Sequence, residues 1–340
     1  MSADVVVVGA GIAGLACAQA LSQAGRRPLV LEKARGVGGR CATRRVRGQA
    51  VDHGVVFFHG SDPEFHAVVR GAISASSIER WPARVEGRGQ PCQPDAFAEG
   101  EWRLASADGV SALPKSLAEG LDVRLGARVD RLEPTPGGFE VFVDGVATVR
   151  ARDAVLALPL EQTCELLGSL AATSREAASA RALLAMTGSL PCLTVLAGYP
   201  AEAPMPEWDV LYPESSDSIQ LVAHDSSKRR QPAFGALVFQ ARPCWSRQHL
   251  DEPVDRWREA MLGEAGRLIG AWAAAPIWSD VQRWRYARAD RGNEFSVPLL
   301  LRWPAGVRLG LAGEAFAPGG GIQAAWSSAR RLARRLLDEE

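Results

Sequence analysis

The glycine pattern near the N-terminus is the feature that most constrains the fold of this chain. Four consecutive valines, Val5–Val8, are followed at once by Gly9, Gly11 and Gly14. An apolar run before a G-x-G-x-x-G pattern and an alanine-rich stretch is typical of the strand, turn and helix that bind a dinucleotide. Gly9 makes the tight turn, Gly11 lets the backbone approach a pyrophosphate, and Gly14 lets the helix pack closely on the sheet.

The acidic residue Glu32 lies at the expected distance from this pattern. It follows the apolar run Pro28–Leu31, which we expect to be a second buried parallel strand. A carboxylate at this place accepts hydrogen bonds from a ribose diol. The helix that begins near Ile12 directs free N–H groups and the positive end of its dipole toward the phosphates. A purely structural glycine turn does not explain this combination, so we predict a dinucleotide-binding unit.

Bulk composition excludes several other classes of protein. The chain has 340 residues, of which 47% are hydrophobic, and its formal net charge is zero. The zero charge argues against nucleic acid or an anionic membrane as a partner. No apolar run reaches the roughly 18 residues of a membrane-spanning helix, and we expect no signal peptide, because the N-terminus enters the first strand almost at once. The histidine spacing fits no metal motif and the cysteines form no CxxC pair, so we expect a metal-free cytoplasmic protein.

A second glycine-rich segment follows Glu32 closely. Residues Gly36–Arg45 read GVGGRCATRR, and such glycines allow a loop to cross a bound cofactor. Arg40 is suited to contact phosphate through charge-assisted hydrogen bonds. Taken alone, a basic surface loop is an equally good interpretation. Beside the N-terminal pattern, the segment favours FAD over NAD, because a long diphosphate lying across the domain needs a second contact.

The C-terminal segment provides the partner to the N-terminal turn. A strand-like run ends at the glycine-rich residues Gly313–Gly321, and the amphipathic stretch Ile322–Leu337 follows. Glu314 is placed to accept a hydrogen bond from a ribityl hydroxyl. The N–H groups of Gly321 and Ile322 begin a helix, so they offer fixed positive charge to the N1–C2=O edge of a flavin. We therefore predict that the two glycine turns converge on a single FAD.

The middle of the chain differs in character from its two ends. Five of the ten tryptophans lie between Trp208 and Trp278, among short strand-like runs that suggest a second sheet carrying a pocket. We predict an α/β fold in which a Rossmann-like FAD-binding domain receives an inserted mixed-sheet α+β substrate domain. The expected FAD-binding domain comprises residues 1–56, 104–170 and 303–340, and the substrate domain comprises residues 57–103 and 171–302.

The chain resembles the renalase-type flavoproteins, a branch of the FAD-dependent amine-oxidase superfamily. The resemblance covers most of the chain and is carried by Gly9–Gly14, Glu32–Arg45, Asp52-His53-Gly54, Asp108–Leu113, Pro191-Cys192, Gln282–Ala287 and Gly313–Trp326. It implies non-covalent FAD and a two-domain topology like that of p-hydroxybenzoate hydroxylase. It also implies a small-molecule substrate, an isomeric dihydro-NAD(P), whose hydride passes to the flavin to give NAD(P)+. Oxygen then takes the electrons and is reduced to hydrogen peroxide.

The expected site residues follow from these motifs and from the resemblance. The residues expected to bind the cofactor are Gly9, Gly11, Ile12, Ala13, Gly14, Glu32, Lys33, Gly38, Gly39, Arg40, His53, Gly54, Val129, Gly313, Glu314, Gly321, Ile322 and Ala325. Oxidation of a dihydropyridine needs no general base, so no residue is assigned as catalytic and the pocket has only to orient the donor.

The candidate substrate pocket is His53, Phe57, Trp284, Arg285 and Tyr286. The three large aromatic rings are suited to pack on a nicotinamide, and Arg285 to contact a diphosphate or a carboxamide. Core packing explains Trp284 and Tyr286 nearly as well. A histidine satisfied by local backbone explains His53 somewhat better than a proton relay does.

Two other functions remain open: an amine oxidase or desaturase of the same superfamily, and a catalytically silent FAD-binding protein. Many amine oxidases place a lysine near flavin N5 through a water molecule. The three lysines here are poor candidates, because Lys33 adjoins the ribose acid, Lys115 is on a surface helix, and Lys228 lies in a polar turn. The last cysteine is Cys244, which leaves no C-terminal thiol for covalent attachment of a flavin. The oligomeric state is not predicted.

Overall fold

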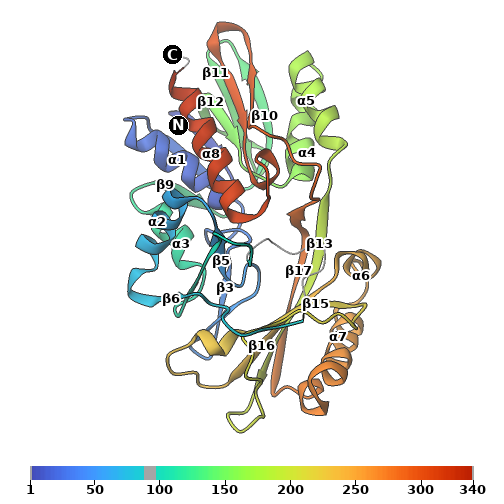
Figure 1. The fold of residues 1–340 in the computed structure, drawn as a ribbon. Helices are drawn as coiled ribbons and strands as arrows, with labels where there is room; N and C mark the ends of the chain where they lie inside the picture. The colour runs from blue at the N-terminus through green and yellow to red at the C-terminus, as the bar shows by residue number, and fades with distance from the viewer. Residues whose placement is uncertain (1, 88–96, 339–340) are drawn as a thin grey trace. The chain divides into compact units, whose positions relative to one another are not determined.

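A computed structural model describes residues 2–87 and 97–338 (Figure 1). The chain forms two compact units, which we call unit 1 (residues 1–39, 113–189 and 288–340) and unit 2 (residues 40–112 and 190–287). These bounds differ from the domain bounds expected from the sequence. Residues 40–56 and 104–112 fall in unit 2, whereas residues 171–189 and 288–302 fall in unit 1.

Unit 1 is built on an eight-stranded mixed sheet. Its strands are β1 (Ser2–Val8), β2 (Pro28–Glu32), β9 (Asp122–Leu125), β10 (Val129–Thr135), β11 (Gly138–Val143), β12 (Val146–Leu156), β18 (Leu299–Arg302) and β19 (Arg308–Leu311). The order is β10-β11-β12-β1-β2-β9, and β19 pairs with both β12 and β18. Strands β9, β2, β1, β12 and β19 run parallel, and β10, β11 and the first half of β12 form an antiparallel meander.

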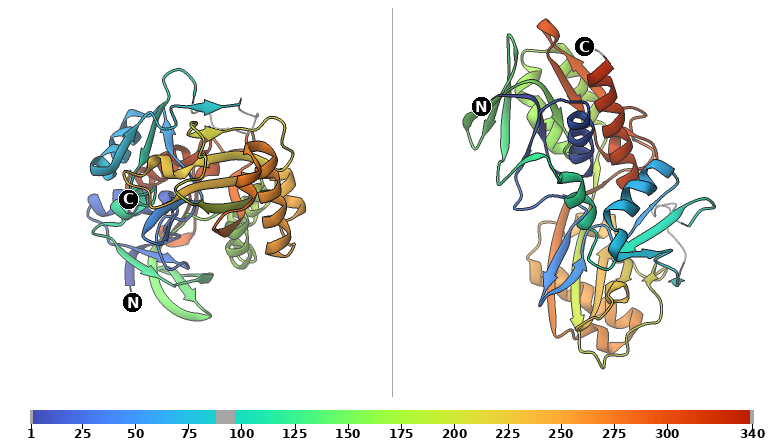
Figure 2. Two further views of the ribbon diagram at one scale, coloured as in Figure 1. Left: turned by 90° about the horizontal axis from the view of Figure 1, so that it is seen from below. Right: turned by 90° about the vertical axis from the view of Figure 1, so that its left-hand side faces the viewer.

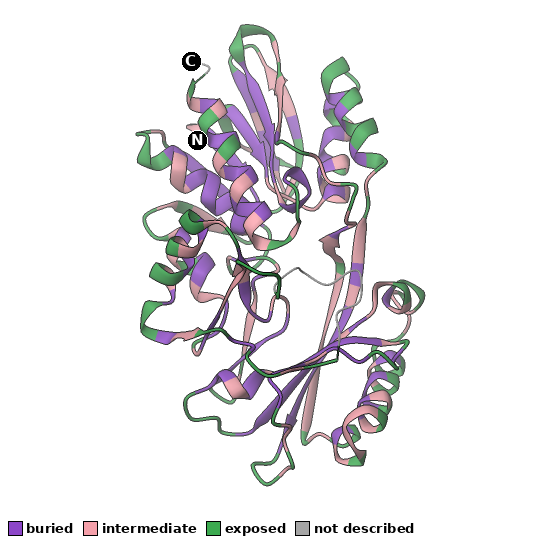
Figure 3. Cartoon of the chain, in the orientation of Figure 1, coloured by how far each residue is buried: buried purple, intermediate pink, exposed green. Residues whose placement is uncertain are grey.

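The helices of unit 1 are α1 (Ile12–Gln23), α3 (Ala112–Ala118), α4 (Leu160–Ala171), α5 (Arg175–Ala185) and α8 (Gly321–Asp338), with short 3-10 turns η4 (Pro304–Gly306) and η5 (Glu314–Phe316). Helices α1 and α8 lie against each other, and α4 packs on α5 (Figure 2). Helix α8 buries Trp326, Ala329, Ala333 and Leu336, a spacing of three and four residues that forms one apolar face. Strand β2 is buried along its whole length, as expected for a parallel strand covered on both faces. Helix α1 is also largely buried (Figure 3).

Unit 2 is built on a six-stranded sheet with the order β17-β13-β16-β15-β14-β7. These strands are β7 (Val85–Glu86), β13 (Ser189–Tyr199), β14 (Val210–Leu211), β15 (Ile219–His224), β16 (Gly235–Ala241) and β17 (Trp278–Ala289). The smaller strands β3 (Thr43–Val46) and β4 (Gln49–Asp52) form a hairpin, and β8 (Trp102–Ser106) pairs with β5 (Phe58–Gly60) and β6 (Ser77–Glu79). The helices are α2 (Pro63–Ala72), α6 (Pro243–Gln248) and α7 (Val254–Ile269), with 3-10 turns η1 (Ser74–Ser76), η2 (Asp225–Lys228) and η3 (Ala271–Ala274).

Both faces of the large sheet in unit 2 are apolar. On β16, Leu237 and Phe239 belong to one hydrophobic cluster, which includes Trp257 and Met261 of α7. The alternate residue Val238 of the same strand belongs to a second cluster. Because successive side chains of a strand point to opposite faces, the continuous apolar run of β16 serves two cores at once.

The α/β Rossmann-like organisation with mixed sheets agrees with the fold class expected from the sequence. In the described part of the chain, no helix combines the length and the apolar character needed to span a bilayer.

Candidate functional site

The parallel strands of unit 1 bring the two distant glycine turns to one edge of the sheet. Val8 of β1 is in register with Leu156 of β12, which is in register with Leu311 of β19. The carboxyl ends of parallel strands meet at the same edge, so the turn after β1 and the loop after β19 emerge there with only β12 between them. In open α/β sheets, ligands bind in the crevice outside these carboxyl ends.

The three glycines of the N-terminal turn have different surroundings. A Cβ atom on Gly14 would lie 1.9 Å from the Gly9 carbonyl oxygen, and a Cβ atom on Gly9 would lie 2.7 Å from the carbonyl oxygen of Ala157. A Cβ atom on Gly11 would meet nothing within 4 Å. Gly9 and Gly14 are therefore needed for packing of the turn, helix and sheet, whereas Gly11 leaves open space of the kind that a pyrophosphate would fill.

The N-terminus of α1 fits an anionic ligand. No side chain caps it, although Ile12 and Ala13 of its first turn are buried. The first N–H groups of a helix have no partner within the helix, and buried donors require an acceptor. A phosphate supplies such an acceptor and is favoured by the helix dipole.

Glu32 and its neighbours frame the same edge of the sheet. The Glu32 side chain is buried and accepts hydrogen bonds from the N–H groups of Ala10 and Ala34, each at 2.8 Å. Since each carboxylate oxygen has a second lone pair, both can also accept from a ribose diol. Lys33 is exposed. Val129 begins β10, two residues after Ala127, whose N–H group donates to the Glu32 carbonyl at 2.9 Å.

The second glycine segment crosses the first. The Gly38 N–H group donates to the Ala10 carbonyl at 2.8 Å, and Gly38 forms an isolated parallel bridge with Gly11. A Cβ atom on Gly39 would lie 3.7 Å from the Cα atom of Gly11. Arg40, the first residue of unit 2, donates to the carbonyl of Ala287 at 3.2 Å, a contact that the sequence does not indicate.

The C-terminal loop is folded tightly against its own helix. Gly319, Gly320 and Gly321 have φ values of 87°, 63° and 73°, a left-handed path that glycine adopts without steric cost. Ser328 of α8 accepts from the Gly313 N–H group at 3.1 Å and donates to the Gly313 carbonyl at 2.8 Å.

One expectation for this loop differs from the structure. The Gly321 N–H group donates to Glu314 Oε1 at 3.0 Å, so the amide expected to face a flavin is bonded within the loop. Glu314 is buried, and the three left-handed glycines fold the chain back onto it. Farther along α8, Ile322 is partly buried and Ala325 is buried.

In unit 2, His53 and Trp284 form a stacked pair. Their ring centroids are 5.5 Å apart with an interplanar angle of 14°, and Trp284 Nε1 donates to the His53 carbonyl at 3.0 Å. Burial, with a smaller effect from the nearby Arg44 charge, lowers the pKa of His53 to about 4, so the ring is neutral at pH 7. Its Nδ1 atom is buried and has no hydrogen-bond partner within the described residues.

The remaining pocket candidates have other contacts. Phe57 is 5% exposed and its ring lies 5.9 Å from that of Trp81, inside a hydrophobic cluster of unit 2. Arg285 pairs with Asp251 at 2.5 Å, with both side chains substantially exposed. Tyr286 is partly buried and shares a face of β17 with Trp284, while Arg285 points to the opposite face.

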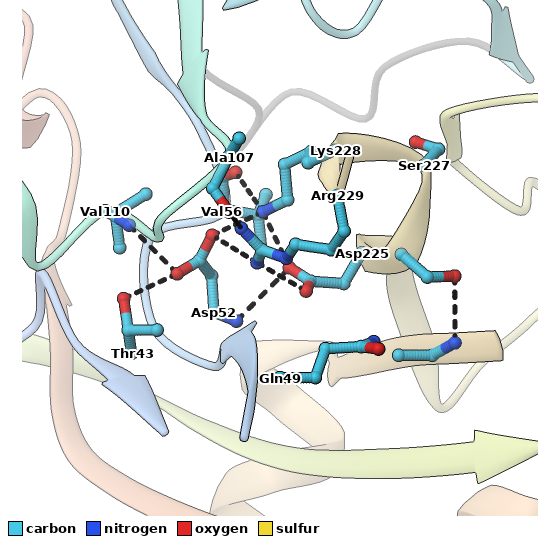
Figure 4. A network of polar contacts seen from close by, with 12 residues as sticks. Thr43, Gln49, Asp52, Val56, Ala107, Val110, Asp225, Ser227, Lys228 and Arg229 are labelled. Atoms are coloured by element: carbon cyan, nitrogen blue, oxygen red, sulfur yellow. Dashed lines mark hydrogen bonds and ion pairs between the residues drawn. The ribbon is translucent and has the colours of Figure 1, made fainter. Parts of the chain in front are cut away.

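The feature that the sequence missed is a buried group of four charges in unit 2, which we call the charge quartet: Asp52, Asp225, Lys228 and Arg229 (Figure 4). Lys228 Nζ lies 2.6 Å from a carboxylate oxygen of each aspartate, and Arg229 Nη2 lies 3.1 Å from Asp52 and 2.6 Å from Asp225. Burial alone raises the pKa of Asp52, but the two cations and its hydrogen bonds outweigh burial and lower it.

The burial of Lys228 was not expected from the sequence. The residue does lie in a short turn, η2, but it is only 1% exposed. A third acceptor, the Val56 carbonyl at 2.9 Å, completes its bonding. The i, i+3 and i, i+4 spacing of Asp225, Lys228 and Arg229 is the one signal in the sequence that favours pairing.

Comparison with known proteins agrees with this geometry. Residues 7–71 match the family described as NAD(P)-binding Rossmann-like domain, and residues 84–337 match the family described as flavin containing amine oxidoreductase. A Mycobacterium tuberculosis protein named as a flavin-containing monoamine oxidase, AofH, is 33% identical over 183 residues. That match covers 54% of this chain and 35% of the relative, so the chain corresponds to about a third of that protein's length.

Two solved structures share the fold over nearly the whole chain. One is named as a protoporphyrinogen oxidase from Exiguobacterium, with a TM-score of 0.76, 14% identity and 99% of each chain covered. The other is cyclohexylamine oxidase from Brevibacterium oxydans, with a TM-score of 0.72, 15% identity and 99% of each chain covered. Because the family match extends over most of the sequence, the cofactor of this chain is FAD, and the chain belongs to the flavin-containing amine oxidoreductase family.

Proposed function

We propose that this chain is a renalase-like oxidase that takes a hydride from an isomeric dihydro-NAD(P) and passes the electrons to oxygen, giving NAD(P)+ and hydrogen peroxide. The observation that supports an FAD enzyme most directly is the meeting of both glycine turns and Glu32 at one sheet edge of unit 1. The proposal includes non-covalent FAD and a topology like that of p-hydroxybenzoate hydroxylase. When bound, FAD supplies the hydride acceptor.

The residues of unit 1 have separate parts in holding the cofactor. The uncapped N–H groups of Ile12 and Ala13 would bind the pyrophosphate, and the space beside Gly11 admits it. Glu32 would accept from the adenosine ribose, and Glu314 from a hydroxyl of the ribityl chain. Both acids are buried and already fixed by backbone N–H groups, so they are oriented before a ligand arrives.

The substrate assignment rests on the lack of a strong proton acceptor among the described pocket candidates. With a pKa lowered to about 4, His53 is too weak a base to take a proton from an ammonium group of ordinary pKa near ~10. The three N–H groups of Lys228 are already bonded to Asp52, Asp225 and Val56. A dihydropyridine gives up its hydride without losing a proton, which is the chemistry that such a pocket supports.

Oxidation of an amine is the second candidate, favoured by the family and by the name of the M. tuberculosis relative. Hydride loss from an amine requires its neutral form, so without a base in the pocket the rate would rise with pH toward the pKa of the free amine. A catalytically silent FAD-binding protein would react with neither substrate class.

The discriminating experiment mixes the purified yellow protein, without oxygen, with borohydride-treated NAD(P)+ and with a panel of amines that includes cyclohexylamine. We expect rapid loss of the flavin absorbance band with the dihydronicotinamide isomers only, and hydrogen peroxide when air is admitted. Bleaching by an amine would replace the first proposal with the second. The absence of bleaching with every compound would favour a silent binding protein.

A further inference from the structure

A short segment of unit 2 with no regular secondary structure, residues 53–56, is held at nearly every peptide group. It follows β4 directly and carries His53 and Gly54, two of the residues expected from the sequence to bind the cofactor. On its amide side, the His53 N–H group donates to the Ala42 carbonyl at 3.2 Å, and the Val55 N–H group donates to the Arg40 carbonyl at 3.0 Å. These bonds tie residues 53–56 to residues 40–42 of the second glycine-rich segment.

On its carbonyl side, three side chains from three different elements hold the same segment. Trp284 Nε1 of β17 donates to the His53 carbonyl at 3.0 Å, and Lys228 Nζ of η2 donates to the Val56 carbonyl at 2.9 Å. Between them, Gln240 Nε2 of β16 donates to the Gly54 carbonyl at 2.5 Å. A carbonyl oxygen only accepts, so the amide group of Gln240 must present its NH2 to Gly54. We call Trp284, Gln240 and Lys228 the carbonyl clamp.

The charge quartet anchors one end of this arrangement. Asp52, the residue just before the segment, is bonded through its carboxylate to Lys228 and to Thr43 Oγ1, both at 2.6 Å, and to the Val110 N–H group at 2.9 Å (Figure 4). The four charges sum to zero, and they are buried where a lost partner leaves an uncompensated charge. Such a network gives the backbone on either side of His53 and Gly54 a single position.

The packing leaves the segment little freedom to move sideways. A Cβ atom on Gly54 would lie 2.1 Å from the Arg40 carbonyl oxygen and 3.2 Å from the Trp284 ring. Residues 53–56 are therefore closely packed between the backbone at Arg40 on one side and the carbonyl clamp on the other.

We propose that the carbonyl clamp positions the backbone of residues 53–56 for the flavin, and that Gln240 is the positioning residue of this site that no sequence motif marks. Trp284 then acts through His53 rather than as a platform for the nicotinamide ring. The inference rests on the proposed function only in treating His53 and Gly54 as residues that bind FAD. It does not depend on which substrate is oxidised.

The test replaces Gln240, because among the three donors of the carbonyl clamp it alone is neither charged, as Lys228 is, nor part of an aromatic stack, as Trp284 is. Gln240→Met keeps the length of the side chain and removes the donor. Gln49→Met is the matched control, because Gln49 is also a glutamine of unit 2 that bonds to backbone, donating to the Phe234 carbonyl at 3.3 Å and accepting from the Ala233 N–H group at 2.8 Å. Lys228→Met is a weaker test, because it leaves two buried carboxylates undercompensated and threatens folding.

Two readouts report on the clamp without using turnover. In the FAD-free protein, we expect amide hydrogen exchange at His53 and Val55 to be about fivefold faster in Gln240→Met, the loss that one hydrogen bond implies. In the FAD-bound protein, we expect a changed visible circular dichroism spectrum of the flavin and a shifted reduction potential. Gln49→Met should alter neither the exchange at these two amides nor the flavin spectrum.

The variant Gln240→Glu should make the flavin spectrum depend on pH, which a purely structural role of Gln240 would not do. A protonated carboxyl donates to the Gly54 carbonyl, whereas an ionised one repels it. The flavin spectrum of this variant should resemble that of the original protein at low pH and change as the pH rises through the pKa of the new carboxyl, which burial beside a carbonyl raises.

Unchanged exchange at His53 and Val55 in Gln240→Met would overturn the clamp itself. Faster exchange with an unchanged flavin spectrum and potential would overturn its link to the cofactor. Failure of every substrate to bleach the flavin would count against the proposed function alone, because neither readout uses a substrate.

Discussion

At the scale of single residues, the neighbours Asp52 and His53 show how burial and partners act on a titratable group. Both side chains are buried and both have a lowered pKa. For Asp52, the attraction of the two cations lowers the pKa by more than burial raises it. For His53, the main cause of the lowered pKa is burial itself. In each case the unfolded chain binds the proton more readily than the folded one, so both residues make the fold less stable as the pH falls.

This gives a prediction for His53. Its folded pKa is about 4 against an ordinary value of 6.5, so its contribution is complete above pH 6.5 and is lost progressively down to pH 4. The loss amounts to about 3 kcal/mol of unfolding free energy. Urea titrations across this pH range should show a flatter pH dependence in His53→Phe than in the original protein. Equal slopes in the two proteins would show that His53 is not a neutral buried group.

Lys228 gives a second prediction at this scale. Removing its charge in Lys228→Met leaves Asp52 and Asp225 with Arg229 alone, which should lower the unfolding free energy by about 3–5 kcal/mol. In the double variant Lys228→Met with Asp225→Asn, the buried charges again sum to zero, so its loss should be smaller than the sum of the two single losses. Strict additivity in urea unfolding would contradict the coupling seen in the charge quartet.

The charge quartet also marks what one sequence reveals about single residues. Asp225, Lys228 and Arg229 are close in the chain, and their spacing is visible. Asp52 lies 176 residues from Lys228, and nothing in a single sequence joins them. For this reason the turn at Lys228 was predictable and its burial was not.

At the scale of elements, the close packing at Gly14 was predictable because the atom that its side chain would meet, the Gly9 carbonyl oxygen, lies in the same strand, turn and helix. Gly9 instead packs against Ala157, which follows the distant strand β12. The C-terminal loop was harder. Its glycine content correctly indicated an irregular backbone before α8, but the bond from the Gly321 N–H group to Glu314 depends on how the loop folds back on itself. The Phe57 ring belongs to a hydrophobic cluster whose other residues come from distant elements, so its burial could not be predicted from the sequence either.

The two glycines of the first turn give a matched prediction. Gly11→Val adds a side chain in open space, so the FAD-free protein should fold with nearly unchanged urea stability but purify without FAD. Gly14→Val places a side chain onto the Gly9 carbonyl oxygen and should lower stability by several kcal/mol as well. Absorbance spectra after incubation with FAD, together with urea unfolding, separate the two effects. A yellow Gly11→Val protein would contradict placement of the pyrophosphate at this turn.

At the scale of the whole molecule, the sequence predicted an α/β chain whose two ends build one unit around an insertion. The sequence did not predict which residues belong to each unit, because long-range strand pairing decides where each segment belongs. Residues 40–56 contain β3 and β4 of unit 2, although they follow the nucleotide-binding motif directly. Residues 171–189 include α5, which packs on α4 in unit 1. Neither assignment can be predicted from secondary-structure propensity or from the spacing of residues in the sequence.

Unit 1 depends on both ends of the chain. Residues 292–340 supply β18, β19 and α8, and β19 pairs with the carboxyl half of β12 next to β1. A fragment of residues 1–291 keeps the whole N-terminal motif but exposes that strand edge and the face of α1 that contacts α8. We expect it to bind no FAD, although Gly9, Gly11, Gly14 and Glu32 are all present.

Co-expression of residues 1–291 with residues 292–340 should restore FAD binding, because the division falls at the exposed turn at Gly292 and leaves every strand and helix intact. Co-purification of the two pieces, followed by the flavin absorbance spectrum of the complex, measures this directly. If both glycine turns contribute to one site, neither piece alone turns yellow and the pair does. FAD bound by residues 1–291 alone with the affinity of the full chain would mean that the C-terminal loop has no part in holding the cofactor, whatever its position at the sheet edge.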